Sequence, residues 1–385
     1  MASSISTQLI EDLDIKPLSG KLVPLKTKGE LEAETDLIDV HVVAVNPRRA
    51  TDVVALIKET FPASRDLELA HLRGYTKFTL LPAQLRSRFE ALIPDEREEV
   101  ILSSLNAHVD GNEKRPPATP SPPVVLTSTI PRSTPISAAQ AAGWSEHFWP
   151  CVYKNTNPYG PHPKILSQST AIVDADAPRF LALAERAAQA CHASNSGPSV
   201  GCVVVERRKD GIAEVVSVAG DARYGGVGSA NSCAGNVMAH AVMRAMGMVA
   251  RKRLRVDEDV QGAGEQSAEE QSAYMDLPLN ELESKFFALD NIAPRGYLCL
   301  NLEIYLTHEP CVMCSMAILH GRFASCVFRR ELPLTGALTT SKGKDSNSLG
   351  YGLFWHQELN WKFFAWKWLD SDVCGIEDDG SGVHA

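Results

Sequence analysis

Three residues of this chain have the types and spacing of a metal site. Cys311 and Cys314 stand three positions apart after Pro310, and His240 lies further upstream. Cysteines at positions i and i+3 share one helix face, and the positive end of the helix dipole favours their thiolate forms. One imidazole with two thiolates leaves a fourth position open, which is typical of catalytic zinc sites. The sequence therefore predicts one zinc ion per chain, bound by His240, Cys311 and Cys314.

Two other interpretations of the cysteine pair stay open. A Cys-x-x-Cys sequence also occurs as a redox pair, and a structural zinc site would be completed by a further His or Cys. His240 taken alone would be interpreted as a packed or capping histidine. Its combination with the cysteine pair favours the metal site.

The elements that must position these residues follow from hydrophobic spacing. Apolar residues at helical spacing around His240 predict a helix over about 237–248. Downstream, the pattern predicts a strand at 302–306, a helix at 310–320 closed by Gly321, and a strand at 324–328. A strand, a helix and a strand in succession imply parallel pairing, so we expect a layered α/β domain.

Two further elements precede the predicted site. Asp176 and Pro178 have the character of a helix start, and the apolar residues that follow share one helical face. Next, two β-rich runs at 200–208 and 213–220 predict a hairpin.

Composition suggests two domains and a linker. We expect a small α+β domain at 1–106, a Pro/Ser/Thr-rich linker at 107–141, and the zinc domain at 142–385. Within the last, residues 256–292 turn acidic and polar, which predicts a surface insertion.

The site residues also carry a resemblance to a known family. His-Ala-Val at 240–242 and Thr-His-Glu-Pro-Cys-Val-Met-Cys at 307–314 resemble the zinc deaminase signature H-x-E…P-C-x-x-C. The second run and the segment at 349–368 are most similar to the tRNA adenosine deaminase group. The resemblance covers about residues 142–370. It implies a cytidine-deaminase-like three-layer α/β/α domain with a mixed sheet.

The sequence departs from this signature at one decisive position. In the superfamily, the residue two after the histidine is a glutamate that moves the proton of the zinc-bound water, whereas here it is Val242. Loss of a positioned acid or base typically lowers the rate by about 10² to 10⁴. Glu309 is no substitute, because catalytic relatives have a glutamate there too.

A valine at this place is what the resemblance leads us to expect of a pseudoenzyme. It implies the non-catalytic subunit of the eukaryotic tRNA wobble-adenosine deaminase, with no catalytic residue of its own. The partners implied are tRNA and a catalytic chain with an intact His-x-Glu motif, which together form a heterodimer that converts adenosine to inosine. The resemblance also implies that the N-terminal extension helps to hold the tRNA.

RNA contacts must be local, because the formal net charge is −9. The interpretation as solvated helix ends and faces stays open for each basic cluster. Candidate contacts lie in the N-terminal part, in a basic run after the His240 helix, and among C-terminal aromatic residues: Arg65, Arg73, Lys77, Arg251, Lys252, Arg253, Lys362 and Lys367.

The C-terminal aromatic residues have two interpretations. Interleaved with Lys362 and Lys367, they could stack on RNA bases. Alternatively, they pack a terminal helix on the sheet or on the partner, and this is favoured because positions 361, 364, 365 and 368 share one helical face.

Two other functions stay open. One is an active zinc-dependent deaminase of free nucleosides or nucleotides with a relocated base, and the other is a zinc-dependent interaction module unrelated to RNA. The sequence has no secretory signal pattern and no run of about 18 apolar residues. We therefore expect a cytoplasmic or nuclear protein without a membrane span.

Overall fold

The computed structural model forms two compact units. One comprises Met1–Lys28 and Lys164–Ala385, and the other comprises Gly29–Pro163. Each unit has its own sheet and core, and each is treated by itself below. The residues that the structure describes are 5–45, 51–52, 55, 69, 71–91, 99–103, 125–225, 235–258, 276–293, 296–340 and 350–371.

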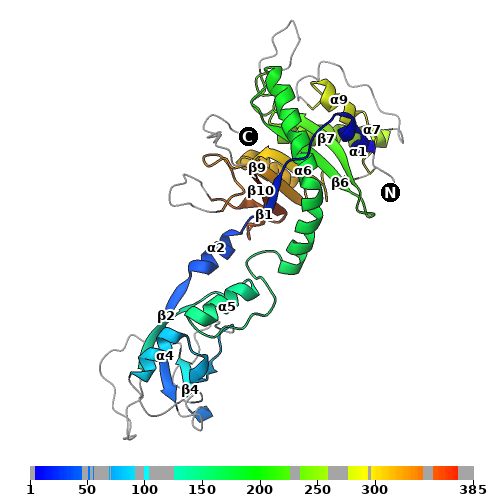
Figure 1. Ribbon diagram of the computed structural model, residues 1–385. Coiled ribbons are helices and arrows are strands. Elements are labelled where there is room, and N and C mark those ends of the chain that lie inside the picture. The colour runs from blue at the N-terminus through cyan, green and yellow to red at the C-terminus, as the bar shows by residue number, and fades with distance from the viewer. Residues whose placement is uncertain are drawn as a thin grey trace. The chain divides into compact units, whose positions relative to one another are not determined.

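The first unit is built on a mixed six-stranded sheet (Figure 1). Its strand order is β1-β10-β9-β8-β6-β7. The pairs β8–β9 and β9–β10 are parallel, and the remaining pairs of neighbouring strands are antiparallel. The strands are β1 (Gly20–Pro24), β6 (Gly201–Arg207), β7 (Ala213–Gly220), β8 (Glu303–His308), β9 (Ser325–Arg330) and β10 (Phe364–Asp370).

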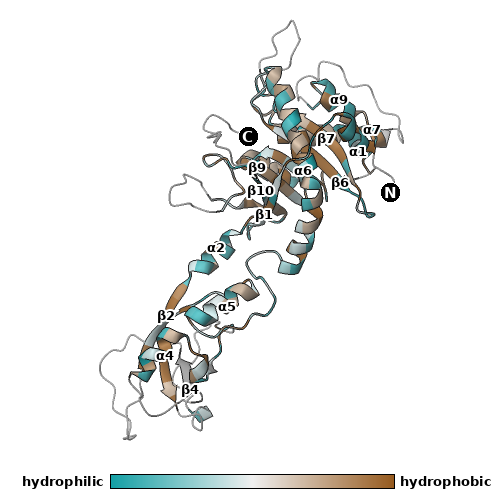
Figure 2. Ribbon diagram, in the orientation of Figure 1, coloured by the Kyte–Doolittle hydropathy of each residue, from teal (hydrophilic) through white to brown (hydrophobic). Residues whose placement is uncertain are grey.

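Helices cover both faces of this sheet, because alternate side chains of its strands are buried on opposite sides. Val203 and Val205 pack in the cluster that contains α6, whereas Cys202 and Val204 pack in the cluster that contains α7 and α10. The strands of the sheet are largely hydrophobic (Figure 2). The elements around it are α1 (Ile5–Asp12), α6 (Pro163–Ala193), α7 (Ala241–Glu258), α9 (Glu281–Phe287), α10 (Val312–His320) and the 3₁₀ helix η3 (Leu353–Trp355).

This arrangement confirms the expected three-layer α/β/α domain with a mixed sheet. The succession β8, α10 and β9 has the parallel pairing that the sequence predicted, with Ile304 opposite Cys326. The predicted hairpin is β6 and β7, in which Gly201 pairs with Gly220.

Helix α6 begins earlier than predicted. It starts at Pro163 rather than near Asp176, and Pro178 lies inside it. The apolar face continues upstream through the buried Val173, and Leu166 packs on the same cluster. An interior proline removes one hydrogen bond and often kinks a helix, but here packing against the sheet outweighs that local cost.

The prediction of a terminal helix among the C-terminal aromatic residues is wrong. Residues 364–370 form strand β10, which pairs with β9 and β1. Trp366 and Trp368 are buried on the α6 face, whereas Ala365 is buried on the opposite face. This alternation has a period of two, and the helical spacing noted in the sequence was coincidental over so short a run.

The predicted insertion at 256–292 is too long. Residues 276–293 return to the first unit, where Phe286 of α9 is fully buried in the α6 cluster. Residues 259–275, which carry most of the acidic run, lie outside the described residues.

The second unit is a small α+β fold with a different extent from that predicted. Residues 1–28 belong to the first unit, since β1 pairs with β10, and residues 125–131 of the expected linker form β5, which pairs with β2. These pairings join segments far apart in sequence, and composition does not report them. The sheet order is β3-β4-β2-β5, and the elements are α2 (Lys28–Thr35), β2 (Leu37–Val45), β3 (Tyr75–Thr76), η2 (Phe78–Leu80), α4 (Ala83–Glu90), β4 (Glu99–Ser103), β5 (Val125–Pro131) and α5 (Ala138–His147).

Within the described part of the chain, no helix is both long and apolar enough to cross a membrane.

Candidate metal centre

The candidate metal ligands lie at the N-termini of two helices. His240 immediately precedes α7, and its carbonyl accepts the first helical hydrogen bond from Arg244 N at 2.9 Å. Cys311 is the N-cap residue of α10, and its carbonyl accepts from Ser315 N at 2.8 Å. Cys314 lies in the first turn of α10. Two positive helix ends therefore face the same site, which favours negatively charged sulfur there.

The donor atoms have the separations that a tetrahedral zinc ion requires. His240 Nδ1 lies 3.5 Å from Cys314 Sγ and 3.9 Å from Cys311 Sγ. All three donor atoms lie within 4.8 Å of one another, and all three residues are buried. Ideal Zn–S and Zn–N bonds of about 2.3 and 2.0 Å at a tetrahedral angle place nitrogen and sulfur about 3.5 Å apart. One imidazole and two sulfurs thus fit a zinc ion with one further position.

The two cysteines have shifted pKa values that favour one thiolate at the site. A hydrogen bond from Cys314 lowers the pKa of Cys311 to about 4, despite the opposing effect of burial, and His240 acts in the same direction. Because Cys314 retains the shared proton, its own pKa is raised. A metal ion bound here would replace this proton, since thiolates are the ligand form.

Val242 belongs to the hydrophobic core beside the site. It lies on the first turn of α7, is 4% exposed, and packs in the same cluster as Cys311, Cys314 and Leu338. Its side chain has no titratable group, and its surroundings are those of a packed residue.

Glu309 has a structural role. Its two carboxylate oxygens accept hydrogen bonds from the backbone N–H groups of Leu332, Leu338 and Thr339. A side chain on Gly336 would collide with this carboxylate. Glu309 therefore fixes the 332–339 loop, which also contacts the site through a backbone bridge between Cys311 and Gly336. This use of both oxygens supports the expectation that Glu309 does not replace the missing base.

Two functional features near the site were missed by sequence reasoning. One is the fully buried ion pair between Arg244 and Glu283, with Nη2 and Oε2 2.8 Å apart, which ties α9 to the first turns of α7. The other is Asp221, a buried carboxylate directly after β7. A lone charged residue inside an apolar run, such as Arg244 among Val242, Met243 and Ala245, is the sequence signal that would have pointed to the first.

The basic run that the sequence placed after the His240 helix lies within α7, and two of its residues are buried. Lys252 is fully buried, and its ammonium donates to Val216 O, Phe286 O and Asn291 Oδ1. Arg253 is buried and donates to two backbone carbonyls, those of Leu298 and Ala293. Arg251 is ion-paired with Asp276 at 2.6 Å. These three residues hold the fold together, so the prediction that they contact RNA is wrong for Lys252 and Arg253 and weakened for Arg251.

The other candidate RNA contacts are dispersed. Arg73 and Lys77 are exposed in the second unit, and Arg65 lies outside the described residues. Lys362 is exposed and lies over the ring of Trp355 at 5.8 Å, while Lys367 on β10 pairs with Glu331 at 2.9 Å. Of the N-terminal candidates within the described residues, Arg73 and Lys77 are thus both accessible to solvent.

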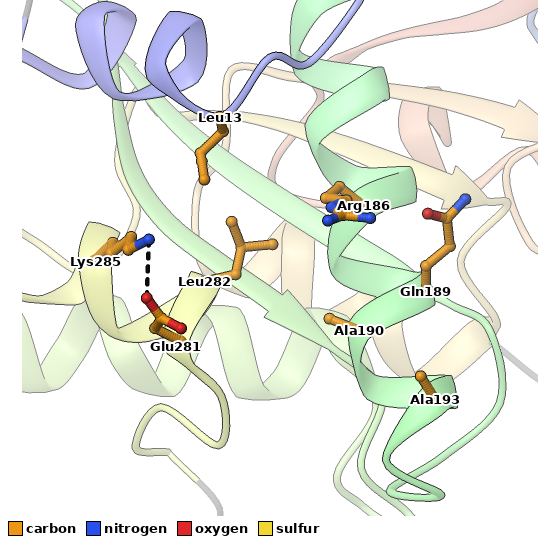
Figure 3. A pocket seen from close by; sticks show the side chains of 8 residues that line it. All are labelled: Leu13, Arg186, Gln189, Ala190, Ala193, Glu281, Leu282 and Lys285. Carbon is orange, nitrogen blue, oxygen red and sulfur yellow. Dashed lines mark ion pairs between the residues drawn. The ribbon is translucent and has the colours of Figure 1, made fainter.

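A surface pocket lies elsewhere on the first unit (Figure 3). It has a volume of about 470 Å³ and contains none of the predicted metal or RNA residues. Two of its three charged residues, Glu281 and Lys285, form an ion pair with each other at 3.0 Å. The pocket therefore has no evident connection to the metal centre. It is lined by Leu13, Arg186, Gln189, Ala190, Ala193, Glu281, Leu282 and Lys285.

The fold and the donor set are those of a deaminase-like domain with a candidate metal site, and sequence comparison agrees. Residues 175–330 match the family described as the cytidine and deoxycytidylate deaminase zinc-binding region. The chain is also similar to the tRNA-specific adenosine deaminase subunit TAD3 of Saccharomyces cerevisiae, with 26% identity over 88% of this chain and 89% of that protein. It therefore contains a cytidine deaminase-like domain and is homologous to TAD3, which confirms the resemblance seen in the sequence.

Two further similarities are to a human protein and to a solved structure. The human protein named probable inactive tRNA-specific adenosine deaminase-like protein 3 is 28% identical over 55% of this chain and 58% of its own length. A solved structure from a study of A-to-I editing by tRNA:A34 deaminases is 19% identical, covers 49% of this chain and 95% of its own, and gives a TM-score of 0.27.

Proposed function

We propose that this chain is the non-catalytic subunit of a heterodimeric tRNA-specific adenosine deaminase that converts adenosine to inosine at the wobble position of the anticodon. The observation that carries the proposal is Val242, which packs as a core residue where the deaminase signature has its proton-shuttling glutamate. The names of the relatives, a tRNA-specific adenosine deaminase subunit and a probable inactive deaminase-like protein, support it.

The deamination step is assigned to the partner, which is the catalytic subunit of the heterodimer and retains the His-x-Glu motif. This chain supplies the scaffold and part of the tRNA-binding surface. Within this chain, His240, Cys311 and Cys314 hold one zinc ion, which joins the first turns of α7 and α10 and stabilises the core between them. In active deaminases the zinc ion activates water, but here Val242 offers no group to take up a proton.

The tRNA surface is proposed to include the second unit. Arg73 and Lys77 are the exposed cations there that the sequence singled out. Because the net charge of the chain is negative, such contacts act locally and are completed by the partner.

Reconstitution tests the function. The chain is co-expressed with a deaminase chain that has an intact His-x-Glu motif, and wobble inosine is sequenced in tRNA treated with each protein and with the complex. We expect association and inosine formation by the complex alone. A partner with His-x-Gln serves as the control for the origin of the chemistry.

Two outcomes would overturn the proposal. Release of ammonia from adenosine, cytidine or deoxycytidylate by the isolated chain would favour the active deaminase. A chain that neither associates with the deaminase nor changes tRNA editing would favour the interaction module.

The zinc site is tested by substitution of one ligand. Cys314→Ser removes a thiolate, so the zinc content measured by elemental analysis should fall from about one per chain to near zero. Cys151→Ser is the matched control, because Cys151 is a half-buried thiol of the second unit. Equal zinc content in both variants, or wild-type protein without zinc, would contradict the assignment.

A further inference from the structure

Asp221 is held next to the metal centre by the backbone. It directly follows the end of β7, and the next residue, Ala222, donates its N–H to Ala239 O at 3.0 Å. Ala239 immediately precedes His240, so the Asp221 segment lies beside the segment that carries the histidine. Ala222 and Ala239 are both buried and pack against each other.

The two carboxylate oxygens of Asp221 have different surroundings. Oδ1 accepts hydrogen bonds from the backbone N–H and the Nε–H of Arg223, at 3.1 and 3.0 Å. Oδ2 is buried and has no hydrogen-bond partner among the described residues. The Asp221 side chain is completely inaccessible to solvent. Buried acceptors in folded proteins are almost always paired, so an acceptor in this position indicates a ligand or an ordered water.

The backbone places Asp221 beside one of the candidate ligands. Asp221 precedes Ala222 and His240 follows Ala239, and the hydrogen bond between Ala222 and Ala239 brings the two segments together. Asp221 is not within the 4.8 Å group of donor atoms, which excludes it as a direct ligand in this arrangement.

We propose that Asp221 is an outer-sphere residue of the metal centre, whose Oδ2 would accept a hydrogen bond from an ordered water molecule beside the metal ligands. The inference rests on the zinc site of the proposed function. Carboxylates that orient groups around a metal typically change its affinity by about 10- to 100-fold. Asp221 stabilises the bound metal in this way, and it comes from an element different from the one that carries Val242.

The test measures zinc affinity of the full-length chain by competition with a chromophoric chelator. We expect Asp221→Asn, which keeps the shape of the side chain, to weaken Zn²⁺ binding by about 10- to 100-fold. The visible spectrum of the Co²⁺-loaded protein, which reports coordination geometry, should change as well. Asp221→Ser is the second variant, because it retains an acceptor for Arg223 N–H but lacks the carboxylate.

Arg223→Gln is the matched control, since it breaks the same ion pair and leaves the carboxylate in place. We expect its Zn²⁺ affinity to stay within about threefold of wild type. If Asp221 served only to hold Arg223, the control would weaken binding as much as Asp221→Asn, and the proposal would be overturned. Wild-type affinity and spectrum in both Asp221 variants would overturn it as well, whereas wild-type protein that binds no Zn²⁺ would overturn the zinc site itself.

Discussion

At the scale of single residues, Val242 separates this chain from catalytic deaminases. The candidate metal donors are all present, with His240 Nδ1 3.5 Å from Cys314 Sγ. Relative to the deaminase signature, Val242 therefore removes a group for proton transfer and leaves the donor set unchanged. Its surroundings have adapted to an apolar side chain, since Val242 packs with buried core residues.

Replacing Val242 by glutamate should not by itself produce deaminase activity. We expect Val242→Glu to release no ammonia from adenosine or tRNA, because the substrate pocket and water access must also be correct. The buried carboxylate should lower the free energy of unfolding by about 1–3 kcal/mol. Ammonia release and urea unfolding measure the two effects, with Val242→Gln as the uncharged control of similar size. Rapid turnover by Val242→Glu alone would show that the rest of the active site is complete.

The buried Lys252 should make the free energy of unfolding depend on pH. Burial lowers its pKa from the ordinary 10.5 to about 7, although three acceptors surround the ammonium. Below pH 7 the lysine is protonated in both the folded and the unfolded chain, so the cost of burying its charge is fully present. As pH rises from 7 towards 10.5, only the folded state loses the proton, and this cost is relieved.

The resulting trend can be measured against a variant without the amine. Relative to Lys252→Met, the free energy of unfolding of the wild type should rise between pH 7 and pH 9, by up to about 1.4 kcal/mol per pH unit. Urea unfolding at several pH values measures the difference. Lys285→Met, at a more exposed lysine of α9, is the control for the exchange of a lysine for methionine. A constant difference between wild type and Lys252→Met would contradict the expectation.

At the scale of elements, buried ion pairs attach the segment around α9 to the site helix. Arg244 of α7 contacts Glu283 of α9 with both side chains completely inaccessible, and it also donates to Gly220 O and Leu277 O. Glu283 accepts the backbone N–H of Gly220 and of Leu279. The pair therefore connects the end of β7, the start of α7 and the 277–283 segment.

Breaking this pair should destabilise the first unit strongly. We expect Glu283→Gln to lower the free energy of unfolding by about 3–5 kcal/mol, because it leaves a buried guanidinium without its charged partner. Asp290→Asn is the control, since its partner Arg255 is partly exposed and such pairs contribute about 0–1 kcal/mol. Similar losses for the two variants in urea unfolding would count against the buried pair as the connecting element.

At the scale of the whole molecule, α1 and β1 near the start of the chain belong to the unit that contains the candidate metal centre. Strand β1 extends the sheet along β10, and Ser6 of α1 donates to Glu214 Oε2 at 2.9 Å and accepts from Val215 N. The second unit has a core of its own, with Val42, Phe89, Ile130 and Trp149 almost completely buried.

Deletion experiments should follow this division. We expect residues 29–163 alone to unfold cooperatively, because their core is self-contained. Residues 29–385 should be less stable than the full chain and prone to aggregation, because β10 becomes an unprotected edge with Trp366 and Trp368 on it. Circular dichroism and light scattering measure both. A 29–385 fragment with the full-length unfolding temperature would argue against this role of residues 1–28.

The sequence by itself identified the candidate metal donors, the position without the glutamate and the β8–α10–β9 unit. Each of these depends on spacing within a short segment: three positions between two cysteines, two between His240 and Val242, and one crossover between parallel strands. Local geometry fixes such features, so a pattern is sufficient to predict them. The same patterns indicate a layered α/β domain, because they show which faces must be covered, whereas its three layers and mixed sheet were implied by the resemblance to zinc deaminases.

Only the tertiary structure decided the features that depend on contacts across the chain. The basic run at 251–255 has the composition of an RNA surface, but its partners Val216, Asp276 and Leu298 come from other elements and place it inside the fold. Strand β10 was mistaken for a helix because its aromatic spacing satisfies both periods, and only pairing with β1 and β9 selects one. Asp221 became recognisable as a neighbour of the metal once the fold brought the end of β7 beside His240, because distance in space, and not in sequence, sets which charges interact.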